Sequence, residues 1–249
     1  MHFKYLIIFS LILFIISSCS VSSKNAENAA MAESVRNLGE AYIAAGNPTL
    51  ALRELLKADS LVPNDPYTNN DLGLAYLSRG IPEKAIYHFK KAIEIKPEYA
   101  PAINNLGTAY IAQADWDSAI ETLVPLTQNI LYATPHFAEA NLAYAYLNKN
   151  EYLKAERHYK ASLDLSPNYV TALRGLSVLY RIKGEFDKSL PMIEKAIRFA
   201  PKNGELYLQK GKTLELAGKR ELAKNAYLKA ISIGTDDVIE EAEMAVKNF

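Results

Sequence analysis

Few residues of this chain could carry covalent, metal or acid–base chemistry. Cys19 is the only cysteine among the 249 residues, which excludes an internal disulfide and a thiolate zinc site. Apart from His2, the histidines are His88, His136 and His158, which lack paired metal-ligand spacing, and we expect them at the surface. The sequence has no glycine-rich phosphate loop. These observations predict a protein that is not an enzyme, with no metal, no cofactor and no small-molecule substrate.

The single cysteine follows a short apolar run. Lys4 supplies positive charge, and the 12 residues of 5–16 are apolar except for Ser10. A transmembrane helix needs about 20 apolar residues, so this run is too short to span well. Its length and flanks are typical of a secretory signal peptide.

The end of the run, Ile16-Ser17-Ser18-Cys19, resembles a bacterial lipoprotein signal. That pattern is an aliphatic residue, two small residues and a cysteine, and all four positions match. The resemblance implies removal of residues 1–18 and lipidation of Cys19, including a palmitate-type acyl chain. One acyl chain binds membranes only marginally, but the three chains of this modification would anchor the protein permanently. The alternative is an ordinary signal peptide with an unrelated cysteine.

The residues after Cys19 predict where the protein would be anchored. Ser20 replaces the aspartate that marks inner-membrane retention in enteric bacteria, so the outer membrane is favoured, with the protein facing the periplasm. The inner membrane stays open as an alternative. Residues 19–31 are small and polar apart from Val21 and Met31, which predicts a flexible leash behind the lipid.

Charge and composition exclude one class of partner. Lys+Arg and Asp+Glu are both 28, the hydrophobic content is 49% and the charged content is 22%. These are ordinary values for a folded soluble domain. Because basic and acidic residues balance, we expect no nucleic acid as a partner.

An internal repeat dominates the rest of the chain. The segment NNDLGLAYLSRG (69–80) returns as INNLGTAYIAQA (103–114), 34 residues later, and VRNLGEAYIAAG (35–46) precedes it by the same interval. Three further copies start at residues 139, 173 and 207. A small residue occupies one column in all six copies, and an aromatic residue follows it three places on in five. The members of the small column are Gly39, Gly73, Gly107, Ala143, Ser177 and Gly211.

Each copy has the pattern of two amphipathic helices joined by a turn. Apolar residues recur at helical spacing, and small residues let the two helices of a pair approach closely. Glycines at 46, 80, 184 and 218 end the first helix, while Pro48 and Pro82 stand at the start of the second. One repeat cannot bury its apolar face alone, so the stack shares a continuous core.

The pattern resembles the tetratricopeptide repeat, a 34-residue helix–turn–helix unit. The resemblance implies an all-α, right-handed superhelical solenoid of six repeats with a C-terminal capping helix. The predicted divisions are 32–65, 66–99, 100–135, 136–169, 170–203 and 204–237 for the repeats and 238–249 for the cap. Asp236 or Asp237 is expected to N-cap the last helix.

The joint between the third and fourth repeats departs from the period. The step there is 36 residues instead of 34, and the joint contains LTQNILYATPHF (126–137). Pro125 is expected to interrupt the preceding helix. The joint is therefore predicted to be longer or bent. It is either a tolerated loop insertion or a break that shapes a groove or contacts a partner.

The resemblance also implies a binding groove lined by first helices. In the family, ligands touch fixed positions of each repeat, and here the middle repeats place apolar residues and amides at them. The fifth repeat places Thr171, Arg174, Gly175, Val178 and Arg181 there. Such a surface suits a helix or strand of another protein. The predicted protein-binding residues are Asn70, Leu74, Leu77, Asn104, Asn105, Thr108, Ile111, Asn141, Tyr144 and Leu147.

Chaperone-binding members of the family hold a terminal carboxylate with a Lys and Asn pair in the first repeat. The matching positions here are Arg36 and Glu40, and Glu40 would repel a carboxylate. The sequence therefore disfavours this subclass. Any single groove residue could instead serve only to pack one first helix on the next.

The combination of lipidated cysteine, leash, six repeats and long third joint with Leu131-Tyr132 resembles the type IV pilus biogenesis and stability lipoproteins, the PilF/PilW pilotin family. That resemblance implies a membrane-tethered scaffold that captures secretin subunits for pilus assembly. One alternative is a general periplasmic repeat adaptor for cell-wall enzymes or outer-membrane assembly. A second is an enzyme or its regulatory arm, although we expect no separate catalytic domain. The sequence leaves the client and the oligomeric state open.

Overall fold

The computed structural model describes residues 24–129, 132–247 and 249, and every regular element in these ranges is a helix. The chain divides into two compact units, Met1–Gln113 and Ala114–Phe249. The division falls in the turn between the two helices of the third predicted repeat. Cys19 and the predicted signal peptide lie outside the described residues.

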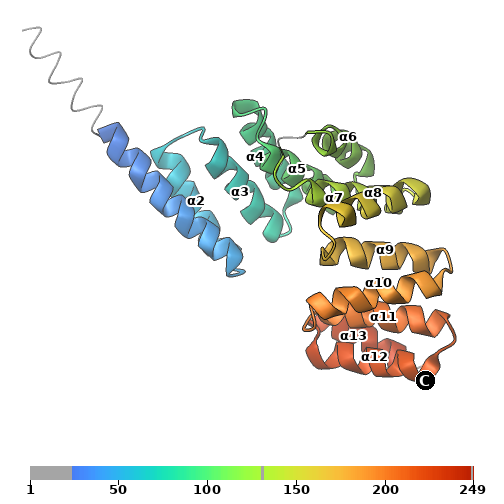
Figure 1. Ribbon diagram of the computed structural model, residues 1–249. Helices are drawn as coiled ribbons and strands as arrows, with labels where there is room; N and C mark the ends of the chain where they lie inside the picture. The colour runs from blue at the N-terminus through green and yellow to red at the C-terminus, as the bar shows by residue number, and fades with distance from the viewer. Residues whose placement is uncertain (1–23, 130–131, 248) are drawn as a thin grey trace, which may run out of the picture. The chain divides into compact units, whose positions relative to one another are not determined.

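Unit 1 contains a long N-terminal helix (residues 24–44) and four shorter helices (Figure 1). The shorter helices are α2 (Pro48–Leu61), α3 (Pro66–Ser78), α4 (Pro82–Ile95) and α5 (Ala100–Ala112). A proline at the first position starts α2, α3 and α4, where its missing N–H is not needed.

Unit 2 contains the remaining helices, coloured from green to red in Figure 1. They are α6 (Trp116–Thr127), α7 (Pro135–Asn148), α8 (Tyr152–Leu165), α9 (Val170–Ile182), α10 (Phe186–Phe199), α11 (Gly204–Leu216), α12 (Arg220–Ile233) and α13 (Asp236–Val246).

Within each unit the helices pack as consecutive pairs. The pairs α3 with α4, α7 with α8, α9 with α10 and α11 with α12 are the helix–turn–helix repeats. First helices also contact first helices of the next repeat: α3 contacts α5, α7 contacts α9, and α9 contacts α11. This arrangement confirms the predicted fold class, and it places the first helices of a unit side by side on one face.

The last helix confirms the predicted cap, with shifted bounds. Helix α13 packs on α11 and α12, and buried Val238 and Ala242 join the core there. It begins at Asp236, two residues earlier than predicted, and its N-cap residue is Thr235. The expectation of an aspartate N-cap was therefore wrong, because Asp236 already has helical geometry.

Glycines in the small column make room for large side chains on the second helix. A Cβ atom built on Gly73 would lie 2.4 Å from Cε1 of Phe89, and one on Gly211 would lie 2.5 Å from Cδ1 of Tyr227. Both large rings are almost wholly buried. The expectation that small residues let paired helices approach closely is thus confirmed, because any side chain at these positions would push the helices apart.

The turns inside the repeats share one backbone conformation. Gly46, Gly80, Gly184 and Gly218 all have φ near +70° (from +69° to +74°), as expected for residues that end a first helix. Ala114 and Asn150 occupy the same turn position with φ of 57° and 59°. The left-handed region raises the conformational free energy of an alanine by about 1–2 kcal/mol, so Ala114 is a strained residue.

Replacing Ala114 by glycine should raise the free energy of unfolding by about 1 kcal/mol, because glycine adopts this conformation without a Cβ penalty. Urea unfolding followed by circular dichroism measures the change. The control is Ala112→Gly, the same substitution at the last residue of α5, which should lower stability by about 0.5–1 kcal/mol. If Ala114→Gly lowers stability as Ala112→Gly does, the strain at Ala114 has no energetic effect.

The predicted leash is partly wrong. It was expected over residues 19–31, but residues 24–31 already belong to the N-terminal helix. Residues 26–33 are mostly alanine, glutamate and methionine, which are strong helix formers, and Ala32 is buried. Small and polar composition suggested flexibility, but helix propensity and this contact outweigh it. Residues 19–23 lie outside the described part.

The joint between the third and fourth repeats is longer than the others, as predicted. Residues 128–134 separate α6 from α7, whereas residues 166–169 suffice between α8 and α9. Pro125 lies inside α6, which ends two residues later, so it shortens the helix without breaking it. Leu126 and Tyr132 are buried at either end of the joint. These two side chains fix the described ends of the joint in the core of unit 2.

Candidate protein-binding surfaces

The predicted groove residues divide between the two units. Asn70, Leu74 and Leu77 lie on α3, and four more lie on the adjacent α5, all in unit 1. Asn141, Tyr144 and Leu147 lie on α7 in unit 2. The members on α5 are Asn104, Asn105, Thr108 and Ile111. The candidate site is therefore two surfaces, each formed by neighbouring first helices.

A hydrogen-bonded polar row crosses the three first helices of unit 1. Asn105 Nδ2 donates to Asn70 Oδ1 at 2.9 Å, and Asn70 Nδ2 donates to Asp71 Oδ1 at 3.2 Å. Arg36 on the N-terminal helix donates to Asp71 Oδ2 at 3.2 Å and also pairs with Glu40. Asn70 and Asp71 are both buried. These amides hold the first helices together, so they are less available to a peptide than the sequence pattern suggested.

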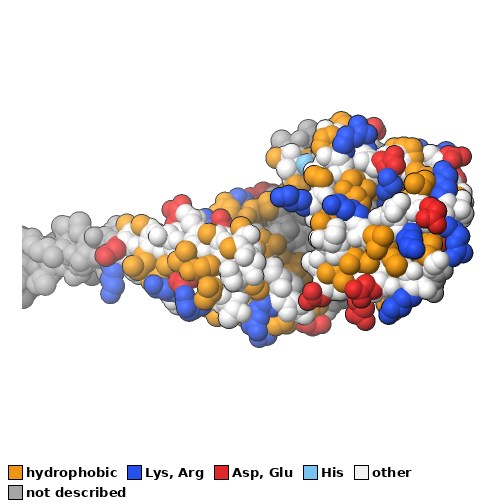
Figure 2. Space-filling model, turned by 90° about the horizontal axis from the view of Figure 1, so that it is seen from below, with side chains coloured by type: hydrophobic (Ala, Val, Ile, Leu, Met, Phe, Trp, Pro, Cys, Tyr) orange, Lys and Arg blue, Asp and Glu red, His pale blue; other side chains and the backbone are white. Residues whose placement is uncertain are grey.

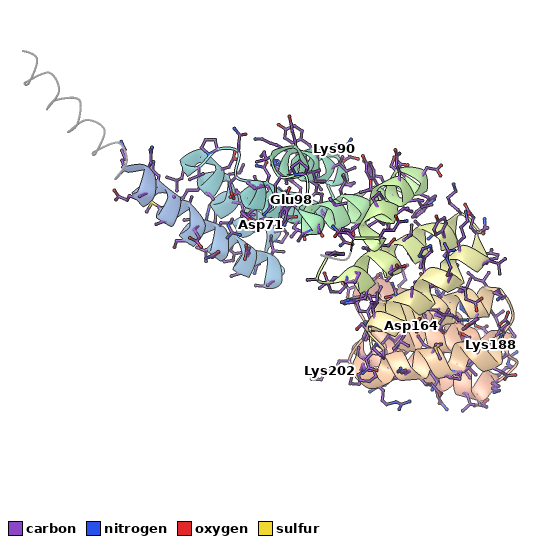
Figure 3. All side chains as sticks on the ribbon, turned by 45° about the horizontal axis from the view of Figure 1, so that its top comes forward. Asp71, Lys90, Glu98, Asp164, Lys188 and Lys202 are labelled. Atoms are coloured by element: carbon purple, nitrogen blue, oxygen red, sulfur yellow. The ribbon has the colours of Figure 1, made fainter. Side chains whose placement is uncertain are left out.

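The carboxyl group of Asp71, which Figure 3 labels, is unusual because it is buried next to the carboxylate of Glu40. Burial, followed by the charge of Glu40, raises the pKa of Asp71 to about 7, although Arg36 opposes the rise. A proton bound at Asp71 can be shared with Glu40, which relieves the repulsion between the two groups. The ionisation state of Asp71 therefore changes near neutral pH.

The raised pKa predicts a specific pH dependence. A carboxyl whose pKa is higher in the folded state than in the unfolded chain stabilises the fold fully below about pH 4. This contribution is lost as pH rises through the folded-state pKa near 7. Asp71→Asn removes the titrating group, so the variant should gain at least about 1 kcal/mol over the wild type between pH 5 and pH 8.

Urea unfolding of both proteins at the two pH values measures this gain. Asp164→Asn, which changes an exposed aspartate on α8 (Figure 3), is the control and should unfold as the wild type does at each pH. A constant difference between Asp71→Asn and the wild type from pH 5 to pH 8 would contradict the raised pKa of Asp71.

The remaining predicted residues of unit 1 contribute partly to the core. Leu74 and Leu77 pack beside buried Phe89 and Leu106. Asn104 is buried, and Thr108 Oγ1 donates to its carbonyl oxygen at 3.1 Å. Ile111 is half-buried. These side chains mainly pack the helices of unit 1 together and contribute little to an open binding groove.

Two aromatic residues at the repeat boundaries of unit 1 are partly exposed and pack on each other. The Tyr67 ring, 39% exposed, meets the Tyr99 ring edge-on with 5.1 Å between centroids. Lys96 Nζ donates to the Tyr67 hydroxyl at 2.9 Å. An open pocket of about 290 Å³ lies beside Tyr67, lined also by Ala29, Ala32, Glu33, Arg36, Val62, Asp65 and Thr68.

In unit 2 the three predicted residues differ in exposure. Tyr144 is 40% exposed and meets Trp116 edge-on with 6.1 Å between ring centroids. Asn141 is half-buried. Leu147 is buried, so it packs inside the stack and offers no surface. Tyr144 is therefore the predicted residue that presents the most apolar surface to a partner.

The histidines are not the surface residues that we expected. His88 stacks on Tyr76 with 5.3 Å between centroids, and His158 stacks on Tyr146 at 5.4 Å. His136 packs edge-on against Tyr169. All three are half-buried between helices, because an imidazole is flat enough to pack on a ring. Within the described residues no group of three or more His, Cys, Asp or Glu side chains could hold a metal ion.

The surface chemistry is mixed. On the face shown in Figure 2, hydrophobic side chains alternate with both signs of charge on each unit. None of the helices in the described ranges is long and apolar enough to cross a membrane.

Comparison with known families gives the chain its classification. Family models described as "Tetratricopeptide repeat" match residues 36–100, 76–130, 140–204 and 204–233. The chain belongs to the tetratricopeptide repeat family. Curated relatives include the "Photosystem I assembly protein Ycf3" of Synechococcus sp. (strain CC9311), 28% identical over 126 residues, or 44% of this chain and 73% of the relative. Ycf3 of Prochlorococcus marinus is 26% identical over 130 residues, or 45% of this chain and 75% of the relative.

Solved tetratricopeptide repeat structures share the fold. PilW, described as a widely conserved type IV pilus biogenesis factor, has a TM-score of 0.75 and 18% identity, covering 86% of this chain and 98% of PilW. PilF of Pseudomonas aeruginosa has a TM-score of 0.71 and 19% identity, covering 89% and 99%. A thermophilic repeat protein of Thermus thermophilus, TTC0263, has a TM-score of 0.66 and 24% identity, covering 74% and 98%. At these identities the likeness defines the fold alone.

Proposed function

We propose that this protein is a non-enzymatic, membrane-tethered scaffold that captures secretin subunits during type IV pilus biogenesis. Lipid on Cys19 anchors it to the outer membrane, facing the periplasm, and the repeats hold the client. The proposal joins the lipoprotein-like signal at residues 16–19 to a family whose repeats bind proteins. A tether also raises the local concentration of client at the membrane.

The observation that carries the scaffold role is the exposed aromatic surface on the first helices. Tyr144 keeps 40% of its surface exposed and lies on α7 beside Asn141, which is half-buried. Exposed tyrosines beside polar groups are typical anchors of protein interfaces. The choice of client rests on the resemblance to the pilotin family and on the description of PilW as a pilus biogenesis factor.

A general periplasmic adaptor for cell-wall enzymes or outer-membrane assembly is the second candidate. The curated relatives are assembly proteins of another complex, which favours a role in assembly without specifying the client. Both functions use the same scaffold and differ in the bound protein.

Capture from solubilised envelopes distinguishes the two and tests the surface. We expect the lipidated protein to recover a secretin, and Tyr144→Ala to lower the recovery about tenfold, because an interface tyrosine contributes about 1–2 kcal/mol or more. The matched control is Tyr87→Ala, which removes a tyrosine 61% exposed on the second helix α4. Recovery of cell-wall enzymes without secretin would contradict the pilotin role.

A further inference from the structure

Two arginines lie on one face of α9 in unit 2. Arg174 and Arg181 are seven residues apart, which is about two helical turns, with Val178 between them. They occupy the face that contacts the neighbouring first helices α7 and α11. This is the first-helix surface to which Tyr144 also belongs.

The two guanidinium groups are linked through α11. Arg181 Nη2 donates to Gln209 Oε1 at 3.0 Å, and Gln209 Nε2 donates to Glu205 Oε1 at 2.8 Å. Glu205 in turn lies 3.6 Å from Arg174 Nη1. We refer to Arg174, Arg181, Glu205 and Gln209 as the two-arginine cluster. It holds two positive charges and one carboxylate.

Within the described residues the charge of Arg181 has no close counterpart. No carboxylate oxygen there lies within 4.0 Å of its guanidinium, and its Nε is buried without a hydrogen-bond partner. Burial lowers the pKa of Arg181, although Tyr227, Glu241 and Glu205 oppose the shift. The nearby Glu241 is already paired with Lys212 at 2.6 Å. A desolvated cation without an ion pair lowers the stability of the fold. Packing alone therefore does not explain why an arginine occupies position 181.

Apolar surface lies next to the cluster. Helix α7, which carries Tyr144, contacts α9, which carries Arg174. Tyr144 is 40% exposed, and Val178 is half-buried. The surface therefore offers an aromatic ring, a half-buried aliphatic side chain and excess positive charge within one unit.

We propose that the two-arginine cluster binds a carboxylate of the partner protein, with Arg181 as the principal contact and Arg174 as the second. The occupant is an acidic segment with apolar residues beside the carboxylate, which would pack on Tyr144. A carboxylate accepts two N–H groups of a guanidinium at once, and it would balance the cluster's charge. The inference rests on the proposed protein-binding function but not on a secretin as the client.

A peptide array tests the proposal without knowledge of the client. The wild-type protein is incubated with random 15-residue peptides carrying either amidated or free C-termini. We expect bound peptides to be enriched in Asp and Glu, or in free C-termini, and 0.5 M NaCl to weaken binding. Enrichment in internal acids identifies a side-chain carboxylate, while enrichment confined to free C-termini identifies the chain end.

Variants then assign the effect to the cluster. Arg181→Gln should lower the affinity for the acidic peptides about tenfold and abolish their enrichment, since hydrogen bonds to a charged group are stronger than those between neutral groups. Arg181→Lys keeps the charge but loses the paired N–H geometry, so it should give an intermediate loss. Lys202→Gln removes an equal charge from the exposed turn after α10 (Figure 3) and should bind as the wild type does.

The outcomes separate the inference from the proposed function. If the Arg181→Gln variant keeps its circular dichroism spectrum and still enriches acidic peptides, the inference is wrong. Arg181 would then have only a structural role, through its hydrogen bond to Gln209. Bound peptides without acid enrichment overturn the inference as well, while leaving the scaffold role intact. If no peptide binds to any variant, both the inference and a role in binding extended segments are wrong.

Discussion

Replacing Cys19 by serine should move the protein from the membrane fraction to the soluble fraction. A serine hydroxyl cannot form the thioether of the proposed lipid anchor, so this variant should carry no acyl chains on residue 19. Each buried methylene contributes about 0.8 kcal/mol to membrane binding, and none of the helices in the described ranges could replace them as a span. Fractionation and mass spectrometry of the N-terminal peptide measure the change.

Ser18→Ala is the control for this experiment, because alanine preserves the small residue of the signal. That variant should stay in the membrane fraction and keep its lipid. A Cys19→Ser protein that remains in the membrane fraction would show that the resemblance to a lipoprotein signal is misleading. The repeats would then be a scaffold without the proposed anchor.

Truncating Phe89 should destabilise unit 1 more than any other single change discussed above. Phe89 is completely buried and packs on the helix face opened by Gly73, where a Cβ would lie 2.4 Å from its ring. We expect Phe89→Ala to cost about 3–5 kcal/mol. Gly73→Ala should cost about 1–3 kcal/mol, because the methyl group overpacks the same contact.

A double variant tests the coupling between the two positions. Gly73→Ala combined with Phe89→Leu should lose less stability than the sum of the single changes, since the smaller leucine makes room for the methyl group. Tyr87→Ala, at an exposed position on the same helix, is the control and should change stability by less than about 0.5 kcal/mol. Additive losses in the urea midpoints would mean that Gly73 and Phe89 do not share one contact.

The repeat pattern allowed most of the fold to be predicted from the sequence. A small residue in every copy, opposite a large apolar one, leaves one way to pair the two helices, as Gly73 with Phe89 and Gly211 with Tyr227 demonstrate. Glycines at the turns encode the left-handed backbone in the same way. Both signals are local or repeated, so a single sequence contains them in full.

The leash and the groove were harder to predict because burial depends on neighbouring helices. Polarity suggested flexibility before residue 32, yet the helix from residue 24 continues into a buried contact at Ala32. Asn70 and Leu147 occupy ligand-facing positions of the repeat pattern, but both are buried. Position within a repeat thus indicates a face of the helix, and the packing of the adjacent first helix decides how much of that face is open.

The surroundings of charged residues were also difficult to predict from the sequence. Arg181 was visible in the sequence at a groove position, but the pattern does not reveal that it lacks an ion pair. Nor does it reveal that Asp71 is buried next to Glu40 and so has a pKa near 7. The environment of each side chain depends on residues of another helix at least 28 positions away in the sequence. The 34-residue period alone does not specify these contacts.

The most direct test of the scaffold proposal is site-specific photo-crosslinking in living cells. A photoreactive phenylalanine analogue replaces Tyr144 in one strain and Tyr87 in another, and mass spectrometry identifies the crosslinked proteins. We predict a crosslink to a secretin subunit from position 144 and none from position 87. Crosslinks to secretin from position 87 alone, or to a different protein from position 144, would contradict secretin capture by this surface.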